Sequence, residues 1–171
     1  MRDLDYAVTD FSGVALRYGG FYGDPDDALV AAVRKRRYPI VGDGGGYTSR
    51  IHVEDAAAAA VAALECAGPE IYNVVDDEPA PVHEWLPVLA EALGAKQPRH
   101  VPLCIVRPFL GQAAIAMGES RGASNAKIKR PLEWTPRYPS WRQGFAHLHG
   151  ASATTSEPDP SAPPGASKLA T

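Results

Sequence analysis

Apolar residues form short strand-like runs that alternate with segments of helical spacing. Gly13–Tyr18 is a largely apolar run typical of a buried strand, and Ile71–Val75 is a second run rich in β-branched residues. The clearest helical spacing covers residues 82–93, and Gly94 follows at the position where helices commonly end. Alternating strands and helices favour an α/β fold with crossover connections.

Local signals predict the remaining elements. Asp26 and Asp27 are candidate N-caps of a helix over residues 28–37, and Asp55 is the candidate N-cap of an alanine-rich helix reaching about residue 66. Further expected elements are extended pieces at 38–41 and 48–53, one or two broken helices at 102–117, and short helices at 125–132 and 141–147. With only two strong strands, the chain looks like part of a parallel sheet, because such strands need neighbours on both sides.

Length and composition suit one domain followed by a tail. The chain has 171 residues, and its 16 Gly and 16 Pro make it rich in turns. Residues 151–171 consist mostly of Ala, Ser, Thr, Pro and Gly. Such a segment buries too little apolar surface to offset its ordering entropy. We therefore expect one domain over residues 1–150 and a disordered tail over residues 151–171.

Charge and cysteine content exclude several classes of protein. A net charge of −3 argues against a general nucleic-acid binder, and no apolar run is long enough to cross a bilayer. Cys66 and Cys104 form no CxxC pair, which suits a reducing compartment, and the five histidines show no metal-ligand spacing. We expect a soluble cytoplasmic protein with no metal, no nucleic-acid partner and no membrane partner.

Two charged or glycine-rich segments have alternative interpretations. The basic run Arg34–Arg37 is expected to complement the dipole at a helix C-terminus, with a phosphate-binding patch as the alternative. The loop Gly42–Gly46 does not match a dinucleotide-binding fingerprint, because Tyr47 stands at the third glycine and an extended piece follows. It is not a P-loop either, since no Lys-Ser/Thr follows. We interpret it as a connection between two short strands.

Six segments form a recognisable series in chain order: Leu16–Gly23, Arg50–Ala56, Ile71–Val75, Ser124–Lys127, Leu132–Pro136 and Tyr138–Ser140. Together they resemble the C-terminal half of the extended short-chain dehydrogenase/reductase family, the NAD-dependent epimerase/dehydratase group. The resemblance implies an α/β fold, a partial Rossmann-like parallel sheet with a helical substrate-binding lobe, from which the N-terminal dinucleotide-binding half is absent. It also implies hydride transfer between NAD or NADP and a small-molecule carbonyl or alcohol.

The family's proton-transfer pair is a Tyr with a Lys four residues later. No Tyr of this chain has that partner, and the nearest arrangement, Tyr138 with Arg142, is interrupted by Pro139. We expect the equivalent positions to lie before Met1, so that no catalytic residue is assigned and no independent catalysis is expected. The family's diphosphate-binding Arg is replaced by Thr48, which favours small substrates over sugar nucleotides.

The resemblance assigns site residues near the strand ends. Expected to pass the nicotinamide are Tyr18, Gly19, Gly20 and Phe21, and expected to line the substrate are Tyr22, Arg50 and His52. A glycine-rich turn anchored by aromatic residues is the structural alternative for residues 18–23.

Two functions from different classes stay open. One is a truncated NAD(P)-dependent oxidoreductase- or epimerase-like protein that needs a partner chain. The other is a non-catalytic interaction or oligomerisation module, or a gene fragment, in which an exposed sheet edge accepts a complementing chain or a second copy.

Overall fold

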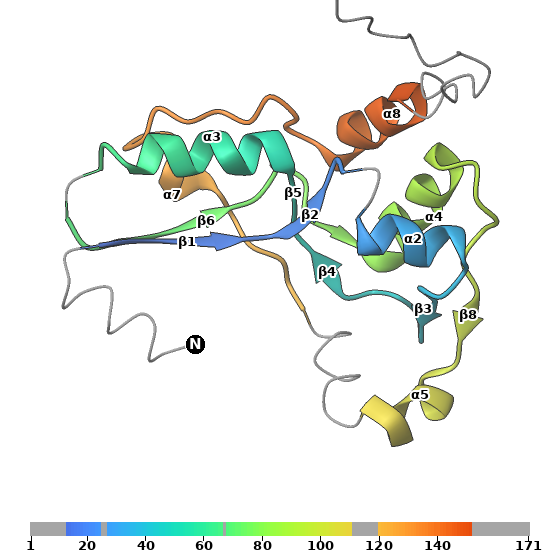
Figure 1. Cartoon of the computed structure of the whole chain (residues 1–171). Coiled ribbons are helices and arrows are strands. Elements are labelled where there is room, and N and C mark those ends of the chain that lie inside the picture. Colours follow the sequence, from blue (N-terminus) through green and yellow to red (C-terminus); the bar gives the residue numbers. More distant parts are fainter. Residues whose placement is uncertain (1–12, 25–26, 67, 111–119, 152–171) are drawn as a thin grey trace, which may run out of the picture.

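The computed structural model describes residues 13–24, 27–66, 68–110 and 120–151 (Figure 1). The expected N-cap Asp26, the expected helical segment beyond residue 110 and the expected tail over 152–171 lie outside the described residues. Ala151 is the last residue of a helix, so it does not belong to the tail.

Two parallel strand pairs form the centre of the fold. Strand β1 (Val14–Tyr18) pairs with β6 (Glu70–Val74), and β2 (Gly20–Tyr22) pairs with β5 (Arg50–His52). The first pair confirms both strands expected from the apolar runs, with the second strand beginning one residue earlier. The fold is therefore α/β with small parallel sheets.

Two smaller pairs lie to one side. Strand β3 (Ile40–Val41) pairs in parallel with β8 (His100–Val101), and β4 (Tyr47–Thr48) pairs antiparallel with β7 (Ala80–Pro81). The Gly42–Gly46 segment joins β3 to β4, as expected of a connection between short strands. Its small residues serve internal packing, since a Cβ on Gly44 would lie 2.6 Å from Ile40 Cγ2.

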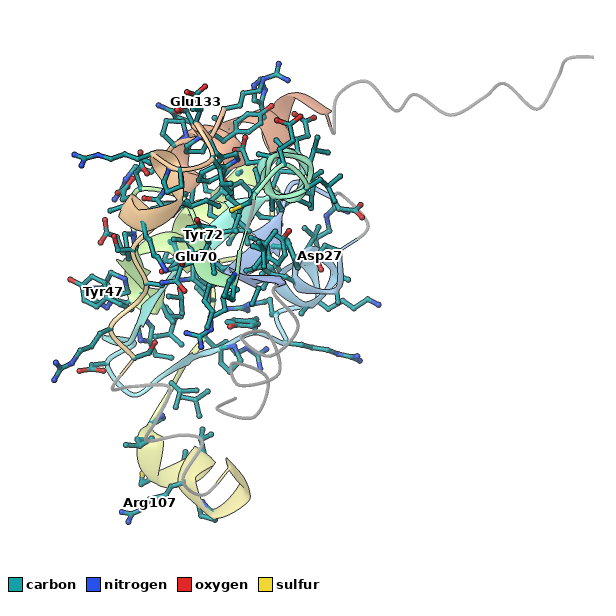
Figure 2. The ribbon with its side chains drawn as sticks, turned by 90° about the vertical axis from the view of Figure 1, so that its left-hand side faces the viewer. Asp27, Tyr47, Glu70, Tyr72, Arg107 and Glu133 are labelled. Atoms are coloured by element: carbon teal, nitrogen blue, oxygen red, sulfur yellow. The ribbon has the colours of Figure 1, made fainter. Side chains whose placement is uncertain are left out.

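Helices cover the strands and form a separate lobe. In chain order they are α2 (Ala28–Arg34), α3 (Val53–Ala63), α4 (Val82–Ala92), α5 (Leu103–Leu110), α7 (Ala126–Lys129) and α8 (Trp141–Ala151). Figure 1 shows α3 along one face of β1 and β6, with α4 and α8 grouped beyond the ends of these strands. Figure 2 shows Arg107 of α5 at the opposite end of the molecule from Glu133.

Apolar side chains divide into two core clusters. The first packs α3 and α7 on the strands and contains Ile51, Ala56, Ala59, Tyr72, Val74, Ile128 and Trp134. The second joins α4, α8 and the end of β2 and contains, among others, Tyr22, Trp85, Leu86, Leu89, Trp141 and Phe145. The second cluster forms the lobe on which the candidate site rests.

Helix α2 is shorter than the helix predicted over residues 28–37. Asp27 caps it as expected, since its carboxylate accepts a hydrogen bond from the Leu29 N–H at 3.2 Å. The helix ends at Arg34, however, because Arg36 adopts a left-handed conformation with φ of 52°. Only Arg34 of the basic run lies in the last helical turn, so the expected dipole interaction applies to that residue alone.

The predicted role of Asp55 as an N-cap is wrong. Helix α3 begins at Val53, two residues before Asp55, and His52 is its N-cap. Asp55 lies in the first turn, is 3 % exposed, and accepts hydrogen bonds from the backbone N–H groups of Arg137 and Tyr138 at 2.7 and 2.9 Å. It therefore attaches the segment before α8 to α3.

Candidate functional site

The chain changes strand partner at two successive glycines. The Gly19 N–H donates to the Val74 carbonyl oxygen at 3.1 Å, whereas the Gly20 N–H donates to the Ser49 carbonyl oxygen at 2.9 Å. A Cβ on Gly19 would lie 2.7 Å from the Ser49 oxygen, so only glycine fits this crossing point. Gly19 is thus required by the close approach of the two backbones, and the cofactor contact expected of Gly19 and Gly20 stays a prediction.

Two aromatic side chains flank this crossing point. Tyr18 and Phe21 are 37 % and 48 % exposed, and their ring centroids lie 5.4 Å apart. The Tyr18 hydroxyl donates to the Ala56 carbonyl oxygen at 3.3 Å, which holds the ring against α3. The pair presents apolar ring surface to solvent at the strand ends, where α/β folds commonly bind ligands.

Tyr22 lies inside the lobe and does not reach solvent. It is 2 % exposed, and its ring makes edge contacts with Phe145 and His52 at centroid distances of 5.2 and 5.3 Å. Its hydroxyl has no hydrogen-bond partner among the residues that the structure describes. Burial raises the pKa of Tyr22, with a further contribution from nearby Asp76, so this phenol stays protonated at neutral pH.

His52 combines a helix cap with an aromatic stack. Its Nδ1 accepts a hydrogen bond from the Glu54 N–H at 3.2 Å, so the neutral ring carries its proton on Nε2. The ring stacks on Tyr138 at a centroid distance of 4.0 Å, and a Cβ on Gly23 would clash with Nε2. Burial lowers the pKa of His52, which favours this neutral form.

Arg50 is buried beneath the strand ends. It is 6 % exposed, and its guanidinium carbon lies 3.4 Å from the centroid of a Trp85 ring. Its Nε has no hydrogen-bond partner in the described part of the chain, and burial lowers the pKa of Arg50 to about 10. The group is still charged at neutral pH, so the lobe contains a desolvated cation stacked on an indole ring.

Asp76 is the functional candidate that the sequence interpretation missed. It lies two residues beyond the end of β6, is 1 % exposed, and donates its backbone N–H to the Arg50 carbonyl oxygen at 2.7 Å. One carboxylate oxygen accepts from the Glu78 N–H at 3.3 Å; among the described residues no donor meets the other in hydrogen-bonding geometry, although the Trp141 backbone N–H acts on the carboxyl group. Burial raises the pKa of Asp76 to about 7. An acidic residue at the carboxyl end of an apolar strand was the available signal.

These groups form what we call the buried polar cluster. Its buried side-chain atoms without a hydrogen-bond partner belong to Tyr22, Arg50, Asp76, Trp85 and Trp141. Charges of Asp76 and Arg50 act on each other and on Tyr22, so these three side chains share one electrostatic environment. Unpaired buried polar atoms are costly and concentrate at functional sites more than in ordinary cores.

Of the residues predicted as site residues, the β2–β5 pair brings five together. Its register sets Gly20 opposite Arg50, Phe21 opposite Ile51, and Tyr22 opposite His52. Phe21 is exposed, whereas Tyr22, Arg50 and His52 are buried. Within the described ranges, no group of three or more His, Cys, Asp or Glu is placed to hold a metal ion, and no helix is long and apolar enough to cross a membrane.

Comparison with known proteins gives a relative in sequence. The chain is 40 % identical over 145 residues to the 3-diazoavenalumate denitrifying reductase of a Streptomyces species. The match covers 81 % of this chain and 48 % of the reductase, so the chain spans about half the length of that relative. No protein-family model matches the chain.

Solved structures give the same fold. A human epimerase family protein, crystallised with NADPH, matches with a TM-score of 0.65 at 20 % identity, over 80 % of this chain and 48 % of its own. The UDP-glucose 4-epimerase of Thermotoga maritima, crystallised with UDP-glucose, matches with a TM-score of 0.66 at 22 % identity, over 90 % and 52 %. The chain is therefore similar in structure to the NAD-dependent epimerase/dehydratase enzymes of the extended short-chain dehydrogenase/reductase family, over about half of their length.

Proposed function

We propose that this chain forms the substrate-side, C-terminal half of an NAD(P)-dependent reductase. The 40 % identity to a named reductase is the observation that carries the proposal. The likeness to the human and Thermotoga structures, at 20 % and 22 % identity, supports the fold but does not favour epimerase chemistry. Thr48, at the position of the family's diphosphate-binding Arg, supports a small carbonyl or alcohol substrate.

In this proposal the exposed aromatic pair contacts the cofactor. A bound nicotinamide would supply the hydride, and Tyr18 and Phe21 offer ring surface at the strand ends against which a planar ring can pack. The Gly42–Gly46 loop provides no phosphate cradle, since its glycines turn the chain and pack on Ile40 and His83. We therefore assign phosphate binding to a separate dinucleotide-binding half and not to the Gly42–Gly46 loop.

The buried residues then position the substrate-side wall. Tyr22 and Arg50 are too deeply buried to touch a ligand from the surface, and we assign them to holding His52 and the Gly23 turn in place. His52 is as buried as Arg50, and its neutral ring, stacked on Tyr138 with Nε2 packed against Gly23, fixes that turn. Tyr22 is not assigned to proton transfer, because its raised pKa keeps its hydroxyl protonated.

A chimera tests this function. The 145 aligned residues of the Streptomyces reductase would be replaced by their counterparts from this chain, and NADH and NADPH oxidation measured with that reductase's own substrate. We expect activity, with Phe21→Ala raising the cofactor KM about tenfold through lost ring contact. Tyr47→Ala is the matched control, because Tyr47 is similarly exposed, at 46 %, but lies outside the strand-end site. A folded chimera that fails to bind either cofactor would contradict the proposal.

One observation favours the second function, an interaction module. Among the described residues, β1 pairs as a strand only with β6, which leaves the other edge of a five-residue strand without a strand partner. Such an edge pairs readily with another chain. In this alternative, the edge accepts either a complementing chain or a second copy of this one.

A further inference from the structure

Two basic segments that are distant in the sequence lie side by side. The first is Arg34–Arg37, at the end of α2, and the second contains Lys96 and Arg99, before β8. The parallel pairing of β3 with β8 brings them together, with the Ile40 N–H donating to the Arg99 carbonyl oxygen at 2.9 Å. Figure 1 shows β3 and β8 adjacent beside the end of α2. We call the six Lys and Arg of these segments the basic patch.

The backbone of the patch is held in place by specific contacts. The Arg36 guanidinium donates two hydrogen bonds to the Gln97 carbonyl oxygen, at 3.2 and 2.9 Å from Nε and NH2. Backbone N–H groups of Lys35 and Arg37 donate to carbonyl oxygens of α2 at 3.2 and 2.8 Å. The remaining cationic side chains are exposed, so the patch presents charge from an ordered surface.

The patch is not neutralised by the chain's own acidic residues. Elsewhere, Lys127, Lys129, Arg137 and Arg142 each form ion pairs with Asp or Glu, whereas among the described residues the exposed cations without such a pair, Arg107, Arg121 and Arg130, are not clustered in the sequence. None of the six patch cations has an acidic partner among the residues that the structure describes. A favourable interaction with the C-terminal end of the α2 dipole explains at most one of the six cations, because the helix ends at Arg34.

The charge of the rest of the chain limits the size of the partner. Without the six patch cations, 11 Lys and Arg remain against 20 Asp and Glu, a net charge of −9. A nucleic-acid duplex or an anionic bilayer extends beyond the patch and would be repelled by that remainder. A single small anion needs convergent donors, whereas these cations are distributed along two segments. We propose that the basic patch binds a short acidic segment of a protein partner, a role separate from the proposed reductase function.

Charge-reversal variants of the full chain test this surface. Binding of a fluorescein-labelled oligoglutamate peptide would be followed by fluorescence anisotropy at low and high salt, with an oligoglutamine peptide of equal length as the neutral probe. The patch variant is Lys96→Glu/Arg99→Glu. The matched control is Arg121→Glu/Arg130→Glu, which changes the net charge equally at exposed positions outside the patch. Circular dichroism and thermal unfolding would verify that both variants fold.

The proposal expects oligoglutamate binding that weakens with salt, falls about tenfold or more in the patch variant, and is retained in the control. The oligoglutamine peptide should not bind. Equal loss in both variants would overturn the proposal, because net charge rather than the patch would then control binding. No oligoglutamate binding at low salt would also overturn it. Tighter patch-dependent binding to duplex DNA or to phosphatidylserine-containing vesicles would replace the acidic segment with another class of partner.

Discussion

Asp76 illustrates how one buried residue can link stability to pH. The residue is 1 % exposed, and burial raises the pKa of its carboxyl group from 3.8 to about 7. The folded protein therefore favours the protonated form. The contribution of this group to stability is complete below about pH 4 and is lost as the pH rises through about 7.

Asp76→Asn should remove this pH dependence. Asn is neutral at every pH and keeps an oxygen for the Glu78 N–H. Between pH 5 and 9, the stability of the variant relative to wild type should increase by up to about 3 kcal/mol. Urea unfolding across this pH range measures the difference. A constant gap between the two proteins would show that Asp76 is already ionised in the folded state at pH 5.

Asp55→Ala should destabilise the protein strongly. The change removes the acceptor of the Arg137 and Tyr138 N–H groups and leaves two backbone donors without a partner. The expected loss is about 2–4 kcal/mol in the free energy of unfolding. Glu54→Ala is the matched control, since its ion pair with Arg137 is exposed and should contribute less than about 1 kcal/mol. Similar losses in both variants would contradict this role of Asp55.

For single residues, local sequence signals suggested a role from the residue type but could not indicate which groups each side chain contacts. An Asp near the start of a helix favours an N-cap, yet Asp55 binds N–H groups that lie 82 and 83 residues later. A charged side chain is normally expected at the surface, yet the Arg50 guanidinium is buried against the Trp85 ring. Both outcomes depend on contacts between distant segments, which one sequence does not specify.

Among the elements, α8 fits the lobe through a single small residue. Gly144 lies in the middle of this helix, where glycine is normally unfavourable, and a Cβ there would clash with the Tyr22 ring. Gly144→Ala should therefore lower the melting temperature despite the better helix propensity of alanine. Gln143→Ala, on the exposed face of the same helix, should leave it nearly unchanged. A stabilised Gly144→Ala protein would contradict the close packing of α8 on β2.

Elements with strong periodicity were predicted well. Helix α4 begins at residue 82 and Gly94 follows it with a left-handed φ of 62°, as the spacing predicted. The short extended pieces were found in the right places, but their pairing was not predictable. Strands of two or three residues carry too little pattern to indicate which distant segment supplies their hydrogen-bond partners.

At the scale of the whole molecule, the edge of β1 that has no strand partner among the described residues should mediate association with another chain or a second copy. The Gly13 oxygen and the Gly19 N–H both bond to β6, so the alternation of a parallel ladder directs the Val14 N–H towards the open edge. Val14→Pro should leave the fold intact and reduce association, measured by sedimentation velocity. Ala15→Pro removes an N–H on the β6 side and should unfold the pair. Unchanged association of a folded Val14→Pro protein would exclude this edge as the interface.

The change of strand partner at Gly19 and Gly20 divides one continuous extended run into two segments whose amides should exchange with solvent independently. The inward-facing amides of β1, those of Ala15 and Arg17, depend on β6, whereas the Gly20 amide depends on the Ser49 carbonyl oxygen before β5. In hydrogen–deuterium exchange, the two halves should therefore acquire deuterium at different rates. A molecule that binds at the strand ends could slow exchange in the second half alone, which would report occupancy without any catalytic assay.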